Sequence, residues 1–202
     1  MNKFTRIQAK KTSISHRKLI RGYFINDAWY KTSGCPIYHR WNSIISRCSP
    51  EDLRYTGCTL SEKWRNFSSF EAWISPQNLG WQIDKDLLIL GNKLYGPDTC
   101  LMVPRSVNML LHDWQGDNSP NGKGVSYDKR PGAKDKPWRA KFSVRDKTVN
   151  IGNYVTKEEA QQAYKKAKAA YVRSVASTYS HHIVMSEALL RFANNLEGLP
   201  NE

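Results

Sequence analysis

The chain has 202 residues, of which 40% are hydrophobic and 24% are charged, and its formal net charge is +13. This length allows one or two domains, and the composition is that of a globular protein rather than a disordered one. No apolar run approaches the ~18 residues of a membrane helix, and residues 3–21 lack the apolar core and cleavage site of a secretory signal. We therefore exclude a membrane protein and expect a cytoplasmic one.

The positive charge is concentrated in two parts of the chain. Residues 1–22 carry seven Lys and Arg and no acid, and residues 121–171 carry thirteen Lys and Arg against five Asp and Glu. The alternative is a basic surface kept for solubility, although solubility gives no reason for the nearly neutral middle of the chain. Such clustering is typical of proteins that neutralise phosphates, so a nucleic acid is the expected partner. Residues 1–22 are predicted to be a basic arm that is mobile until it meets an acidic partner.

Residues 23–112 follow the arm and are rich in aromatic side chains. A first helix is predicted over residues 36–48, where four apolar residues recur at helical spacing: Ile37, Trp41, Ile44 and Ile45. A second helix is predicted over residues 61–73, where aromatic residues recur every three positions: Trp64, Phe67, Phe70 and Trp73. Such a stripe is more typical of a core than of a base-stacking surface.

Residues 82–103 have extended character, with apolar residues on both sides of a Gly91-Asn92 turn. We expect a hairpin there, followed by a short helix that begins at Pro104 or Ser106. Residues 113–123 have no apolar periodicity and are predicted to be a linker. The four cysteines, at positions 35, 48, 58 and 100, lack metal-ligand spacing and are expected to be reduced, partly buried thiols.

Three short strands and a helix are predicted over residues 124–172. The strands span residues 124–127, 138–145 and 147–154, and Thr156 with Glu159 forms a capping box that starts the helix. In the second strand apolar residues alternate with Arg139, Lys141 and Arg145, so one face is apolar and the other is basic. Arginine can bind guanine through two hydrogen bonds, whereas lysine mainly contacts phosphate. The alternative is that these side chains are only solvated. Residues 173–202 are predicted to be a helical extension, with a helix over 183–196.

An ordered series of residues runs through this region: Gly124-Val125, Trp138-Arg139-Ala140-Lys141-Phe142, Ile151-Gly152-Asn153-Tyr154, Glu158-Glu159-Ala160 and Ala163-Tyr164. It resembles the APETALA/ethylene-response-factor DNA-binding domain in the form found in phage and bacterial mobile elements. The resemblance implies a three-stranded sheet in the major groove of double-stranded DNA. The DNA-binding residues that it implies by matching position are Trp138, Arg139, Lys141 and Arg145. Two more cations of the same region, Lys129 and Arg130, are further candidate DNA-binding residues. Ser126 stands where many members have an arginine, which puts that contact in doubt.

A second series lies upstream: Trp41, Arg47-Cys48, Tyr55, Gly57-Cys58, Trp64, Phe67, Phe70, Asp84-Lys85-Asp86, Gly91-Asn92-Lys93, Tyr95 and Pro97-Asp98-Thr99-Cys100. Over residues 23–112 it resembles the HNH-type endonucleases of phages. The resemblance implies a strand hairpin and a helix that hold one divalent metal, with a histidine that activates water. The candidate catalytic residues are Asp84, Lys85, Asp86 and Asn92, and the candidate metal ligands are Asp84, Asp86 and Asp98.

The upstream region departs from the HNH pattern at its general base. Lys85 stands in the usual position of the histidine, and a protonated lysine cannot act as a base at neutral pH unless its pKa is strongly lowered. Asp84 and Asp86 share one face of a strand, and their oxygens would suit Mg²⁺. Equally, both carboxylates could be turn and salt-bridge residues that flank Lys85. A histidine could also be recruited from elsewhere, His39 or His112.

The expected fold is therefore α+β, with a degenerate ββα-metal (HNH-like) domain followed by a three-stranded antiparallel sheet packed on a helix. We expect a phage-encoded homing endonuclease in the host cytoplasm that uses a divalent metal, Mg²⁺, and no small-molecule cofactor. The alternative is a catalytically inactive DNA-binding or regulatory protein that retains the nuclease fold. An RNA-binding protein is a third possibility, because charge alone does not distinguish nucleic acids.

Overall fold

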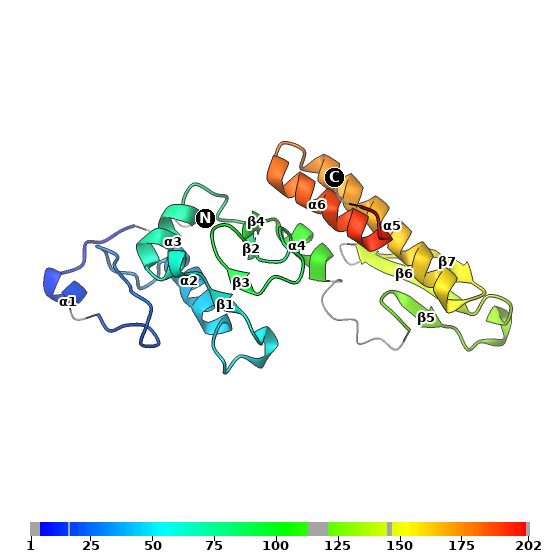
Figure 1. Ribbon diagram of the computed structural model, residues 1–202, viewed down its shortest axis with the longest axis horizontal. Coiled ribbons are helices and arrows are strands. Elements are labelled where there is room, and N and C mark those ends of the chain that lie inside the picture. Colours follow the sequence, from blue (N-terminus) through cyan, green and yellow to red (C-terminus); the bar gives the residue numbers. More distant parts are fainter. Residues whose placement is uncertain (1–4, 16, 113–120, 145–146, 201–202) are drawn as a thin grey trace. The chain divides into compact units, whose positions relative to one another are not determined.

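The computed structural model describes residues 5–15, 17–112, 121–144 and 147–200. The chain divides into two compact units, Met1–Met102 and Val103–Glu202, which we call unit 1 and unit 2. Both contain helices and strands (Figure 1), and unit 2 has a three-stranded antiparallel sheet, as expected for an α+β protein. No helix within the described ranges is long and apolar enough to cross a membrane. Of the predicted linker, residues 113–120 lie outside the described residues.

Unit 1 consists of short helices and two-stranded pairings. Its elements are α1 (Lys11–Ser15), α2 (Pro36–Arg47), η1 (Leu53–Tyr55), β1 (Thr59–Leu60), η2 (Glu62–Trp64), α3 (Phe67–Ile74), β2 (Gln82–Asp84), β3 (Leu94–Tyr95) and most of β4 (Leu101–Val103), whose last residue begins unit 2. The predicted first helix is confirmed as α2, which begins at Pro36, where a missing backbone N–H costs nothing. Its predicted apolar residues are all buried.

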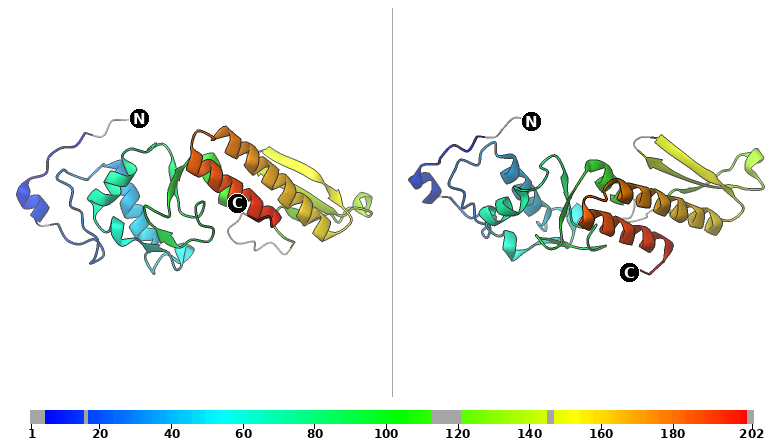
Figure 2. Two further views of the ribbon diagram at one scale, coloured as in Figure 1. Left: turned by 45° about the horizontal axis from the view of Figure 1, so that its top comes forward. Right: turned by 90° about the horizontal axis from the view of Figure 1, so that it is seen from above.

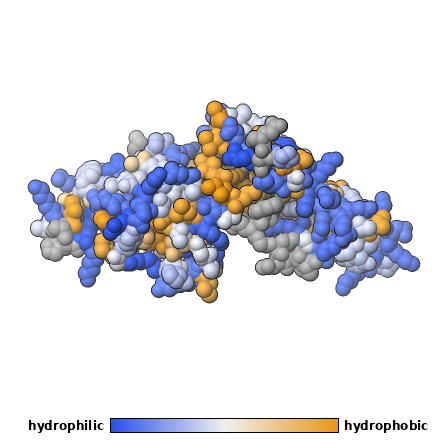
Figure 3. All heavy atoms as spheres, in the orientation of Figure 1, coloured by the Kyte–Doolittle hydropathy of each residue, from blue (hydrophilic) through white to orange (hydrophobic). Residues whose placement is uncertain are grey.

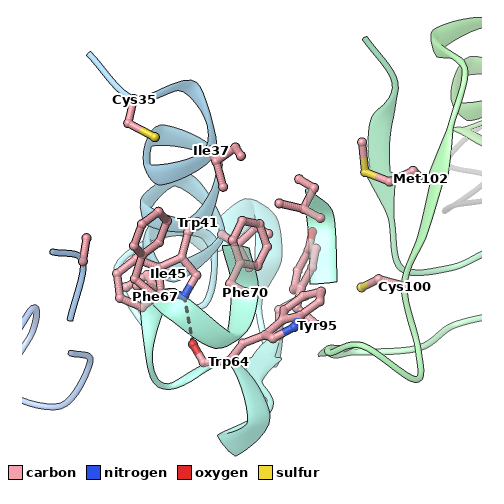
Figure 4. Close-up of a cluster of buried hydrophobic side chains, with 14 of the residues drawn as sticks. Cys35, Ile37, Trp41, Ile45, Trp64, Phe67, Phe70, Tyr95, Cys100 and Met102 are labelled. Carbon is pink, nitrogen blue, oxygen red and sulfur yellow. Dashed lines mark hydrogen bonds between the residues drawn. The ribbon is translucent and has the colours of Figure 1, made fainter. Parts of the chain in front are cut away.

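The aromatic stripe forms the core of unit 1, as the sequence predicts. Trp64, Phe67 and Phe70 are almost fully buried with Trp41 of α2, whose indole N–H donates a 2.8 Å hydrogen bond to the Trp64 carbonyl (Figure 4). The single helix predicted over 61–73 is instead broken into η2 and α3. The break lies at Asn66, whose extended backbone pairs with Ile25 as an isolated bridge and so cannot stay helical.

The predicted hairpin within residues 82–103 is wrong in its pairing. Strand β2 pairs with β4, and β3 pairs with β1 in parallel. The first strand ends at Asp84 because its Oδ1 accepts hydrogen bonds from the backbone N–H groups of Asp86 and Leu87, at 2.9 and 2.7 Å. These bonds form a turn where the sequence pattern suggested a longer strand. The sequence predicts a strand, a paired strand and then a short helix. In the structure β2, β4 and α4 (Arg105–His112) follow one another in this order, with β3 between the two paired strands.

The described part of the basic arm is folded onto the rest of unit 1, which differs from the mobile segment expected from its charge. Arg17 holds it in place by donating hydrogen bonds of 2.6 to 3.1 Å to the carbonyl oxygens of Asn26, Ala28 and Tyr30. In addition, Arg6 forms a 3.0 Å ion pair with Glu71. Both arginines therefore have partners within the protein, so fewer cations of the arm can bind an acidic ligand than its charge suggests.

We expect Arg17→Ala to lower the free energy of unfolding of unit 1 by about 1–3 kcal/mol, because three carbonyl groups lose their donor. Tryptophan fluorescence in urea would measure this, since unit 1 carries five of the seven tryptophans. The exposed neighbour Lys18→Ala is the matched control and should change little. Equal effects of the two substitutions would contradict the role of Arg17.

Unit 2 contains α4 and, after it, β5 (Val125–Tyr127), η3 (Pro131–Ala133), β6 (Trp138–Val144), β7 (Lys147–Tyr154), α5 (Lys157–Thr178) and α6 (Ile183–Glu197). The three predicted strands are confirmed, and so is the capping box, in which Thr156 and Glu159 cap each other's backbone. Helix α5 runs on past residue 172, and α6 folds back along it. As Figures 1 and 2 show, α5 lies between the sheet and α6.

Candidate nucleic-acid interface

The sheet of unit 2 has one face packed on α5. From the strands, Val125, Ala140 and Phe142 are buried there against Ala160 and Tyr164 of the helix. The alternation predicted for β6 is therefore confirmed: its apolar side chains face α5, and the residues between them face the other way.

The pairing of β6 with β7 determines which residues share the opposite face. Arg139 pairs with Asn153 and Lys141 pairs with Asn150, and directly paired residues project to the same side of a sheet. The register shifts by one residue between these two pairs, so Ile151 is a bulge residue on β7. Because of this bulge, two asparagines three positions apart lie on one face.

We call the face opposite α5 the polar face. It is made of these residues from β5, β6, β7 and the position after β5: Ser126, Asp128, Arg139, Lys141, Ser143, Thr148, Asn150 and Asn153. The last five are exposed, and the first three are half-buried. All have hydrogen-bonding side chains, so this face can bind polar edges of a ligand at several points.

One carboxylate on the polar face binds two arginines. Asp128 accepts a 2.6 Å hydrogen bond from Nη2 of Arg139, and it also accepts bonds from Nε and Nη2 of Arg130, at 2.9 and 2.6 Å. The bonds from Arg130 hold the pKa of Asp128 well below its usual range. The carboxylate is thus charged at neutral pH, and it fixes the direction of both guanidinium groups.

A basic loop extends the polar face beyond the end of β5. It includes four exposed cations: Lys129, Arg130, Lys134 and Lys136. Asp135 is the exposed acid among them. The end of unit 2 that carries this loop is covered mostly by hydrophilic residues (Figure 3). Exposed cations beside a polar sheet face can contact phosphates on either side of a groove.

The residues predicted to bind DNA are only partly brought together. Arg139 and Lys141 lie on the polar face, and Lys129 and Arg130 lie in the adjoining loop. Trp138 instead packs against the core that faces α5, with its ring 5.0 Å from that of Tyr127. Arg145 lies outside the described residues. The polar face also holds residues that were not DNA-binding candidates from the sequence: Asp128, Ser143, Thr148, Asn150 and Asn153.

In unit 1, three of the four candidate catalytic residues form a clamp across one loop: Lys85, Asp86 and Asn92. The ammonium group of Lys85 donates to Asp86 Oδ1 at 2.6 Å and to the carbonyl oxygen of Asn92 at 2.8 Å. In return, the amide of Asn92 donates to the carbonyl oxygens of Lys85 and Leu94, at 2.8 and 2.7 Å. Lys85 is buried. The two side chains therefore fasten the loop through each other's backbone.

The proposed metal ligands have other partners. Asp84 is buried and its burial raises the pKa of its carboxyl, while Oδ1 caps the turn at the end of β2. Asp86 binds Lys85, and the exposed Asp98 forms a 2.6 Å ion pair with Lys63. Among the residues that the structure describes, no three His, Cys, Asp or Glu side chains converge to hold a metal ion. His39 is exposed on α2. In the described part of the chain, these three carboxylates are therefore held by separate partners.

The four cysteines are free thiols, and only Cys48 is less than fully buried. Burial raises the pKa of Cys48 and Cys100 to about 12. Thiols with such values stay protonated at neutral pH, so these two are poor nucleophiles.

No family model matches this chain, and no curated protein and no solved structure gives a significant match.

Proposed function

We propose that this protein binds double-stranded DNA by laying the polar face of unit 2 in the major groove. The observation that carries the proposal is the separation of the sheet into two faces. One face is apolar and covered by α5, and the other combines Arg139 and Lys141 with two asparagines and small hydroxyl side chains.

The chemistry of the polar face suits base edges in a wide groove. The major groove is about 12 Å wide and accepts a β-ribbon, and its edges carry distinct donors and acceptors. Arginine can bind guanine through two hydrogen bonds, and asparagine can do the same with adenine. Arg139, Asn150 and Asn153 are therefore the proposed base readers. Lys141 and the exposed basic loop would contact phosphates and orient the protein on the duplex.

Competition between nucleic acids tests the proposal. A labelled DNA duplex would be titrated with the full chain, and unlabelled duplex DNA or duplex RNA of the same sequence would be added as competitor. We expect the DNA to compete better, because the major groove of A-form RNA is deep and narrow and excludes side chains. Equal competition by RNA would favour the RNA-binding alternative, and no binding to the DNA would refute the proposal.

We do not propose cleavage, because the side chains expected to hold a metal are engaged in the Lys85 clamp, the turn at Asp84 and the Asp98 ion pair. Supercoiled plasmid incubated with Mg²⁺ or Mn²⁺ should remain intact. Nicking by the wild type that is lost in an Asp84→Ala, Asp86→Ala variant would restore the endonuclease hypothesis.

A further inference from the structure

We propose that Asp128 is a specificity residue that orients Arg139 to read one guanine in the DNA. This inference rests on the proposed function, since it concerns the same polar face. Asp128 follows β5, and its backbone N–H still donates to the carbonyl oxygen of Pro137, at 2.7 Å. It therefore continues the strand register and projects beside Arg139, whose own partner on β5 is Ser126.

The two arginines that bind Asp128 are held in different ways. Arg130 uses both Nε and Nη2, and its side chain is 72% exposed at the rim of the sheet. Arg139 uses Nη2, and its side chain is 32% exposed on the sheet itself. A guanidinium group has five N–H donors, so Arg139 retains enough of them to bind the two acceptors of guanine. Arg130 is better placed to contact a phosphate.

A fixed carboxylate beside a reading arginine has two effects on binding. It holds the guanidinium group in one direction, so less side-chain entropy is lost when the base is bound. It also places a negative charge close to the DNA backbone, and the repulsion lowers the affinity for every sequence. Only a sequence with the correct base offsets this loss, through its hydrogen bonds with the arginine. Asp128 should therefore lower the overall affinity while it raises the preference for the right sequence.

Selection from a pool of random-sequence DNA duplexes tests this role. The wild type, Asp128→Asn and Asp135→Asn would each be used to enrich duplexes from the same pool, followed by sequencing. Asp135 is the matched control, because it is an exposed acid in the same loop and its replacement removes the same charge. Arg139→Lys is a further variant that keeps the positive charge but loses the planar fork.

For the wild type we expect at least one enriched guanine position. Asp128→Asn should bind the unselected pool more tightly than the wild type does. Its preference for guanine over the other bases at that position should fall roughly tenfold, and its preferences at the other positions should not change. Arg139→Lys should lose preference at the same position, and Asp135→Asn should lose none. Asp128→Asn and Arg139→Lys should therefore affect the same position of the DNA site, a result that a general loss of folding would not produce.

Several results would overturn the inference. One is a wild type that binds duplexes without enriching any guanine position, and another is an Asp128→Asn profile equal to that of Asp135→Asn. A uniform loss of preference at all positions would assign Asp128 a merely structural role. In each of these cases the protein still binds duplex DNA, so the proposed function stands. Failure of the wild type to bind the pool would instead refute the proposed function itself.

Discussion

Replacing Lys141 by glutamate should weaken binding to duplex DNA by roughly tenfold to a hundredfold at physiological salt. Lys141 is exposed in the middle of β6 on the polar face, beside Asn150 of β7. The substitution would remove the proposed phosphate contact of Lys141 and would set a like charge against the DNA backbone. Fluorescence anisotropy with a labelled duplex at several salt concentrations would measure the affinity. The dependence of affinity on salt should become shallower, because fewer counterions are released on binding.

Lys166→Glu provides the control for total charge. Lys166 is exposed on α5, the helix that covers the other face of the sheet, and its replacement changes the net charge by the same amount. We expect an effect several times smaller than that of Lys141→Glu. If the two substitutions weaken binding equally, affinity depends on net charge alone, and the polar face is not the interface.

Replacing Lys85 by methionine should lower the free energy of unfolding of unit 1 by about 3–5 kcal/mol. The ammonium group is buried and binds both Asp86 and the Asn92 carbonyl oxygen. Without it, the largely buried carboxylate of Asp86 loses its cation, which costs far more than breaking an exposed pair. Urea denaturation followed by tryptophan fluorescence would report the loss.

Two further variants test the cause of this effect. Lys93→Met changes an exposed lysine in the same loop and should alter stability by less than about 0.5 kcal/mol. The double variant Lys85→Met, Asp86→Leu should regain much of the stability, because it also removes the largely buried carboxylate of Asp86. A Lys85→Met protein as stable as the wild type would mean that the clamp does not hold the loop.

Much of unit 2 could be predicted from sequence because its signals are local. The alternation in β6 and the capping box of α5 each depend on neighbouring residues, and both are present in the structure. The polar face was harder to predict. Asn150 and Asn153 share a face only because Ile151 forms a bulge, and a strict two-residue period would put them on opposite sides. Asp128 belongs to the face through its contacts across strands.

The loop of unit 1 could not be predicted because its partners depend on tertiary structure. The sequence Asp84-Lys85-Asp86 is compatible both with a metal site and with a turn that contains a salt bridge. Two features distinguish a salt-bridged turn from a metal site here: Lys85 is buried, and it exchanges hydrogen bonds with Asn92, which lies seven positions further along the chain. Neither feature can be read from the sequence pattern. The hairpin prediction was wrong for a related reason, since the side chain of Asp84 ends the strand early.

The two units also differ in how far apart in sequence their contacting residues lie. In unit 1 the arm binds residue 71 through Arg6, and the parallel pair of β1 and β3 joins residues 59–60 to 94–95. Unit 2 is built from a meander of adjacent strands and a helical hairpin. Chains whose contacts close short loops fold faster than those that must close long ones. The polar face therefore belongs to the half of the protein whose topology permits rapid folding, whereas unit 1 must bring distant segments together before its core can form.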